Sequence, residues 1–130
     1  MIEKIVLRYL SLKSFSSFEL KKKLIRRGFD LLEIEAVLNK CISRGYINDR
    51  ELAERRAELY KKKGYGPLWI SGKLKNQGLK LPSYSWDEQR AVLEKLLTTP
   101  IFAKKDRDKQ IAALQRRGFD LQVIFQVIKD

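Results

Sequence analysis

Apolar residues recur along most of the chain at the three-to-four-residue spacing of helices with one buried face. The clearest stripe follows an i, i+3, i+4, i+7, i+8 pattern and consists of Ile34, Val37, Leu38, Cys41 and Ile42. No segment shows the convincing alternation of apolar and polar residues that a half-buried strand would need. The pattern therefore predicts an all-α protein.

Capping residues and helix breakers set the expected helix boundaries. A capping box, which pairs a polar N-cap residue with a glutamate three residues later, predicts helix starts at Ser16, Asp30, Asn48 and Ser85. Pro67 suits the first position of another helix, and Pro100 is expected to end the helix that Ser85 begins. Residues 102–107 carry no clear pattern. Helices are expected over residues 2–12, 16–27, 31–45, 48–63, 67–78, 85–97, 108–117 and 121–129.

One short segment is repeated. Residues 24–30 (LIRRGFD) match residues 114–120 (LQRRGFD) ninety positions later, and residues 74–79 (LKNQGL) form a weaker copy. Each copy has cations or polar residues in a last helical turn, followed by a glycine where the backbone usually becomes left-handed. The aspartate of the first copy has Glu33 to complete its capping box, whereas the later copy has Val123, so the later cap is expected to be weaker.

The glycines of these copies divide the chain into three units of about three helices. Gly28, Gly78 and Gly118 are separated by fifty and then forty residues. We therefore infer that about one helix has been lost or merged at a shortened junction between the second and third units. Such units contact mainly their neighbours, which predicts an elongated, curved array. The chain is expected to form a single helical-repeat domain over residues 1–130, with units of about 1–45, 46–85 and 86–130.

The composition points to an acidic partner and away from catalysis. Lys and Arg number 28 against 16 Asp and Glu, which gives a net charge of +12 and suits nucleic acid or an acidic protein groove. The chain has no histidine, the commonest general base and metal ligand. Cys41 is the single cysteine and lies on an apolar stripe, so a buried thiol is expected. We expect no enzyme activity, cofactor or metal site.

No segment has the pattern of a secretory signal or a membrane span. The N-terminus lacks a signal-peptide hydrophobic region, and no apolar run approaches the roughly 20 residues that a membrane-spanning helix needs. Residues 64–66 (GYG) lead into Pro67 and lack the Gly-Lys-Ser/Thr of a phosphate-binding loop. A cytoplasmic monomer without a membrane role is the expectation.

Basic groups on several helices are the candidate partner contacts. Four cations share one face of the second predicted helix because they form i, i+4 pairs; they are Lys22, Lys23, Arg26 and Arg27. A middle group consists of Arg55, Lys62, Lys63 and Lys73, and a last pair consists of Arg116 and Arg117. If the units curve, these groups could line one concave side. The alternative is that they are solvated helix faces and cations that compensate helix dipoles.

Tyr65 and Trp69 are the aromatic candidates. Beside a Gly-Pro turn an aromatic side chain more often packs locally than contacts a partner. An exposed Trp69 would instead suit a protein contact or base stacking.

An ordered set of motifs resembles the RecX family of regulatory proteins. It consists of residues 44–49 (RGYIND), residues 63–67 (KGYGP) followed by Ile70 and Leu74, and residues 116–119 (RRGF). The resemblance implies three tandem three-helix units. It also implies binding to filaments of RecA, inhibition of RecA ATPase and strand exchange, and a role in DNA recombination, repair and the SOS response. It implies no enzyme activity or cofactor. Arg56 stands where the family often has an aromatic or other large side chain.

Two other functions remain open from the residues. The chain could be a helical protein that binds single-stranded or duplex DNA directly without a RecA role, which steep salt dependence in the absence of RecA would reveal. It could also be a helical-repeat adaptor for an acidic protein.

Overall fold

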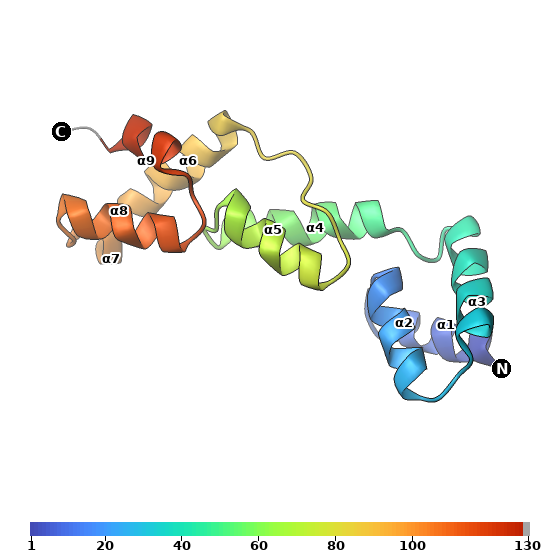
Figure 1. Ribbon diagram of the computed structural model, residues 1–130. Helices are drawn as coiled ribbons and strands as arrows, with labels where there is room; N and C mark the ends of the chain where they lie inside the picture. Colours follow the sequence, from blue (N-terminus) through green and yellow to red (C-terminus); the bar gives the residue numbers. More distant parts are fainter. Residues whose placement is uncertain (129–130) are drawn as a thin grey trace.

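The computed structural model describes residues 1–128, and this part of the chain is built from helices without a strand (Figure 1). Their bounds are α1 (Ile2–Leu12), α2 (Ser17–Arg26), α3 (Leu31–Ser43), α4 (Asp49–Lys62), α5 (Pro67–Asn76), α6 (Trp86–Leu97), α7 (Pro100–Ala103), α8 (Arg107–Arg116) and α9 (Leu121–Val127). The all-α expectation is confirmed. The expected end of the last helix at Lys129 lies outside the described residues.

The shortened junction comes from a shortened helix. Over residues 1–128 there are nine helices, enough for three units of three, so the inferred loss of a whole helix is wrong. Pro100 does follow α6, but it also begins α7, which has four residues against eleven in α1. A helix of one turn is too short to show a periodic pattern, so α7 could not be predicted from the sequence.

Of the four expected capping boxes, two are complete and one is absent, while at Asn48 only one of the two bonds is present, from the Glu51 N–H to the Asn48 side chain. The hydroxyls of Ser16 and Ser85 accept the N–H groups of Glu19 and Glu88, and each glutamate side chain bonds back to the N-cap N–H. Asp30 makes no side-chain cap bond, so the capping box predicted there is wrong. Its side chain is exposed, where water can satisfy the free N–H groups.

The order of the two aspartate caps is therefore the reverse of the expectation. The carboxylate of Asp120 accepts the N–H of Gln122 at 3.1 Å. Because that bond reaches only two residues along the chain, the identity of residue 123 has no part in it.

The three glycine turns have the same backbone structure. Gly28, Gly78 and Gly118 have φ values of +87°, +74° and +98°, in the left-handed region that a helix C-terminus of this type needs. In each turn the N–H of the next residue bonds a carbonyl five residues back, at 3.3, 2.8 and 3.2 Å for Phe29, Leu79 and Phe119. The repeat seen in the sequence is thus a repeat of the turn.

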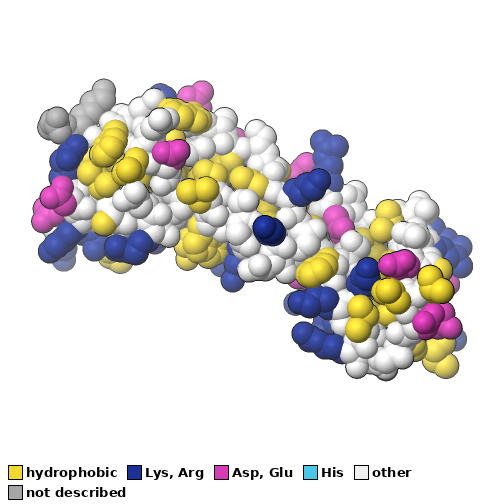
Figure 2. Space-filling model, in the orientation of Figure 1, with side chains coloured by type: hydrophobic (Ala, Val, Ile, Leu, Met, Phe, Trp, Pro, Cys, Tyr) yellow, Lys and Arg dark blue, Asp and Glu magenta, His cyan; other side chains and the backbone are white. Residues whose placement is uncertain are grey.

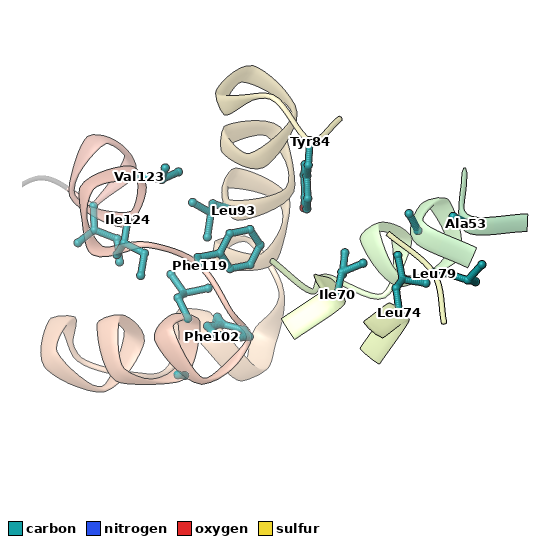
Figure 3. Packing of buried hydrophobic residues seen from close by; sticks show 14 of the residues in the cluster. Ala53, Ile70, Leu74, Leu79, Tyr84, Leu93, Phe102, Phe119, Val123 and Ile124 are labelled. Carbon is teal, nitrogen blue, oxygen red and sulfur yellow. The ribbon is translucent and has the colours of Figure 1, made fainter. Parts of the chain in front are cut away.

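Within residues 1–128, the buried apolar side chains form two clusters. The first belongs to α1, α2, α3 and the segments beside them, and includes Val6, Leu20, Leu24, Ile34 and Cys41. Burial raises the pKa of the Cys41 thiol, as expected for a structural cysteine. The second cluster runs through α4 to α9, and Figure 3 shows Ile70 and Leu74 continuing the group formed by Leu93, Phe102 and Phe119.

We call α1–α3 the first unit and α4–α9 the C-terminal block. Figure 1 shows them arranged end to end, with the N-terminus at one end of an elongated molecule and α6–α9 at the other. The unit boundaries near residues 45 and 85 remain predictions from the sequence.

Candidate partner-binding surface

The four basic candidates at α2 divide into two pairs by their contacts. Lys22, Arg26 and Arg27 are exposed, and Lys23 is half-buried. Lys23 and Arg27 lean back onto α1, where the Lys23 ammonium lies 5.4 Å from the centre of the Tyr9 ring and Arg27 donates to the Tyr9 hydroxyl at 3.3 Å. Lys22 and Arg26 are therefore the better placed of the four to contact a partner.

The middle group is spread along α4 and α5. Arg55 is near the first unit, with one guanidinium nitrogen 3.5 Å from the Ser14 hydroxyl. Lys62 lies seven residues further along α4, roughly 10 Å along the helix axis. It is exposed, as is Lys63. Lys73 is exposed on α5, with its ammonium 5.8 Å from the centre of the Trp69 ring.

Tyr65 and Trp69 pack on each other. Their rings are stacked with centroids 3.6 Å apart and planes 9° from parallel, and Tyr60 meets Trp69 edge-on at 5.2 Å. Both Tyr65 and Trp69 are half-buried. The arrangement agrees with the local packing expected beside a Gly-Pro turn.

Arg117 links the turn after α8 to the turn after α4. Its guanidinium donates to the carbonyls of Lys63 at 3.0 Å and Gly64 at 3.2 Å, and lies 5.3 Å from the centre of the Tyr65 ring. These contacts give Arg117 a structural role, whereas the neighbouring Arg116 is exposed. The pair predicted from sequence is thus split between packing and surface.

Two backbone hydrogen bonds also join the start of α5 to the turn after α8. The N–H of Gly66 donates to the Arg117 carbonyl at 2.7 Å, and the N–H of Leu68 donates to the Gly118 carbonyl at 3.0 Å. A Cβ atom on Gly66 would lie 2.6 Å from the Gly118 carbonyl carbon, and one on Gly118 would lie 2.3 Å from the Trp69 nitrogen. Glycine at both positions permits this approach.

Arg56, which was not among the candidate contacts, joins the first unit to the C-terminal block. Its guanidinium meets the two Glu19 carboxylate oxygens at 3.0 and 3.1 Å, the Gln77 amide oxygen at 2.8 Å and the Ser14 carbonyl at 3.1 Å. Burial opposes ionisation of Glu19, but its bonds to Arg56 and Ser16 outweigh burial and lower its pKa. The sequence feature that could have drawn attention to Arg56 was its departure from the family pattern, which often has an aromatic or other large side chain at this position.

Two serines complete this contact. Ser17 donates its N–H and its hydroxyl to the Asp49 carboxylate at 2.9 and 2.6 Å. The Ser16 hydroxyl donates to the Gln77 carbonyl at 2.6 Å. These bonds link residues 32 and 61 positions apart, so no local sequence pattern could reveal them.

On the face shown in Figure 2, Lys and Arg side chains stand in separate groups. Hydrophobic and uncharged surface separates the groups at the C-terminal end from those around the first unit. Continuity of the basic groups along one concave side remains a prediction.

Similarity to known proteins identifies the family of this chain. A family model for the first three-helix domain of RecX matches residues 4–41. The regulatory protein RecX of Legionella pneumophila is 32% identical over 135 residues, covering 95% of this chain and 90% of that protein. The chain belongs to the RecX family. The RecX of Acidithiobacillus ferrooxidans is 29% identical, with 95% of this chain and 86% of that protein covered.

Solved RecX structures share the fold. The crystal structure of RecX from Lactobacillus salivarius matches with a TM-score of 0.82 at 23% identity, over 96% of this chain and 90% of that one. A second RecX crystal structure matches with a TM-score of 0.79 at 19% identity, over 96% of this chain and 68% of that one. The relatives are named regulatory proteins, and RecX is a family of regulators rather than of enzymes.

Residues 1–128 show no membrane-spanning helix and no cluster of metal-binding side chains. No helix in this range is long and apolar enough to cross a membrane. Nor does this range contain a group of three or more His, Cys, Asp or Glu side chains placed to hold a metal ion.

Proposed function

We propose that this RecX-family chain binds RecA filaments in the cytoplasm and inhibits RecA ATPase and recombinase activity. The single observation that carries this proposal is the 32% identity to a RecX regulatory protein over 95% of the chain. The exposed cations on α2, α4 and α8 add support, since a filament on DNA presents phosphates and acidic side chains. The chain is proposed to act as a monomer.

The proposed contacts are a subset of the residues expected from sequence. Seven exposed cations that make few contacts within the chain are proposed to meet RecA or DNA; they are Lys22, Arg26, Arg55, Lys62, Lys63, Lys73 and Arg116. The other five are proposed to position this surface; they are Lys23, Arg27, Tyr65, Trp69 and Arg117.

The direct test is RecA's single-stranded-DNA-dependent ATPase, measured with increasing amounts of the chain at two salt concentrations, beside a gel shift of the DNA alone. Substoichiometric inhibition without a matching DNA shift would support action on the filament. Absence of inhibition, together with salt-sensitive DNA binding, would favour the second candidate, a protein that binds nucleic acid directly. The net charge of +12 is the observation that keeps this candidate.

Paired charge reversals localise the contact. Lys22→Glu/Arg26→Glu on α2 should weaken inhibition and leave helicity unchanged. The matched control is Lys4→Glu/Arg8→Glu, an exposed i, i+4 pair on α1 with the same change in charge. Equal effects of the two double variants would mean that only the overall charge matters.

A further inference from the structure

A groove lies between the C-terminal end of α4 and α6, and among the proposed partner contacts only Lys62 lines it. Its volume is about 430 Å³, and we call its apolar lining residues Ala91, Val92 and Leu96 of α6 the floor. Lys62 and Lys95, which we call the edges, also line it and are exposed. Ligand-binding clefts typically combine an apolar lining with a few polar or charged groups.

The acidic residues of the groove are already bonded within the chain. Glu58 and Glu88 both line it, and both bond the ammonium of the buried Lys61, at 3.3 and 2.9 Å. No ion pair among residues 1–128 involves Lys62 or Lys95. The lining therefore has three lysines against two glutamates, and Lys62 and Lys95 are the lysines left to attract an anionic group.

The floor is held in place by close packing. Gly64 has φ +89°, and a Cβ atom there would lie 2.7 Å from a methyl carbon of Leu96. The turn after α4 thus rests directly on α6 at the groove. The apolar floor is therefore part of the folded C-terminal block and does not need a ligand in order to form.

We propose that this groove binds an acidic peptide segment of a protein partner, with an apolar side chain on Ala91, Val92 and Leu96. Carboxylates beside that side chain would pair with Lys62 and Lys95. Nucleic acid fits this groove less well, because its lining contains no aromatic ring on which a base could stack. The inference goes beyond RecA inhibition, since it can be measured without RecA.

The test uses the full chain and a fluorescein-labelled 12-residue peptide in which Asp or Glu alternates with Leu. Fluorescence polarisation gives its Kd. A peptide with Ser in place of Leu has the same charge, and a 12-nucleotide poly-dT probe reports nucleic-acid binding. We expect the Leu peptide to bind at least about fivefold more tightly than the Ser peptide, because only leucine gains from the floor.

Two variants examine the floor and the cations separately. Ala91→Trp fills the groove without a change in charge, and Ala36→Trp places the same side chain on exposed α3. Lys62→Glu/Lys95→Glu reverses the charge of the two lysines at the groove edges. Lys104→Glu/Lys109→Glu makes an equal change in charge at exposed sites away from the groove. Each groove variant should raise the peptide Kd about tenfold, and each control less than about threefold.

Several outcomes would overturn the proposal. Equal affinity for the Leu and Ser peptides would mean that only charge is recognised. An unchanged Kd for Ala91→Trp would place the peptide elsewhere, as would equal losses for the two charge reversals. Loss of poly-dT binding in parallel with peptide binding would assign the groove to nucleic acid. Circular dichroism of each variant, with retained helicity, confirms that the comparison concerns binding.

Discussion

The two contacts that join the parts of this molecule are built from different chemistry. The first unit meets the C-terminal block mainly through hydrogen bonds and one ion pair, centred on Arg56 and Glu19, and Phe18 also packs closely against Gly78. Within the block, the turn before α5 meets the turn after α8 through a shared apolar cluster and the backbone bonds of Gly66 and Leu68. We call these the polar junction and the glycine junction.

The difference indicates which part of the molecule can move. A polar junction loses little on opening, because water replaces its hydrogen bonds and salt screens its charges. Opening the glycine junction would expose apolar side chains such as Phe119, which is 2% exposed. We therefore expect α4–α9 to move as one body and the first unit, with Lys22 and Arg26, to change its orientation more easily.

The largest expected effect is at the glycine junction. Gly118→Ala should lower the free energy of unfolding by more than about 3 kcal/mol, because the cost of a left-handed alanine adds to a clash with the Trp69 backbone. Gly28→Ala is the matched control, since it has a similar φ but no atom within 4 Å of the added Cβ. It should cost about 1–2 kcal/mol. Urea denaturation measures both, and equal costs would contradict the close packing at Gly118.

These two glycines show which features could be predicted from the sequence and which could not. Both copies read RRGFD, and local rules predicted both turns and their left-handed backbones. The different surroundings of Gly28 and Gly118 were not predictable, because Trp69 reaches Gly118 only when segments about fifty residues apart pack together. Caps and periodicity are local, so helix positions were predicted well, except for the single turn of α7.

The candidate contacts show the same limit. Exposure of Lys22 and Arg26 followed from the helical pattern of α2. The contact of Arg117 with the Lys63 carbonyl spans 54 residues, and that of Arg56 with Glu19 spans 37. Each depends on how two helices are placed relative to one another. Arg117 was therefore predicted to contact a partner, and the structural role of Arg56 was not predicted.

The second prediction concerns the ion pair of the polar junction. Arg56→Ala should destabilise the fold by about 1–3 kcal/mol, because the partly buried Glu19 carboxylate loses its charged partner. Glu19→Gln retains a side chain that can complete the capping box with Ser16. A double-mutant cycle of these two changes should give a coupling of at least about 1 kcal/mol.

Arg55→Ala provides the control for this prediction. Arg55 is a neighbouring arginine whose side chain is exposed and whose contact with Ser14 is at the limit of a hydrogen bond, at 3.5 Å. A cost as large as that of Arg56→Ala would mean that general charge, rather than the Glu19 pair, holds the junction.

The third prediction is that acid opens the polar junction. The pKa of Glu19 is lowered in the folded chain, so its contribution to stability is present above the unfolded value, near pH 4.3 for glutamate, and is lost as pH falls through the lower folded value. Dyes on Asn39→Cys and Glu94→Cys, exposed positions on α3 and α6, would report the distance between the first unit and the block. Energy transfer should stay constant to about pH 5 and change below pH 4.

Two observations sharpen the pH experiment. Glu19→Gln should remove most of the change in energy transfer, since the titrating group is gone. Glu88 also has a lowered pKa, because Lys61 and the Ser85 N–H bond it, but it lies within the C-terminal block. An unchanged pH response in Glu19→Gln would therefore assign the acid effect to another carboxylate.

The smallest expected effect comes from a single hydroxyl of the polar junction. Ser17→Ala removes the 2.6 Å bond from the serine hydroxyl to Asp49 but keeps the bond from the Ser17 N–H. The variant should lose about 0.5–1.5 kcal/mol, the usual net value of one hydrogen bond. Ser83→Ala, at an exposed position outside the helices, should be neutral. If Ser17→Ala also broadens the energy-transfer distribution at neutral pH while Ser83→Ala does not, one bond measurably restrains the first unit. An unchanged distribution would mean that the remaining contacts of the polar junction set its orientation.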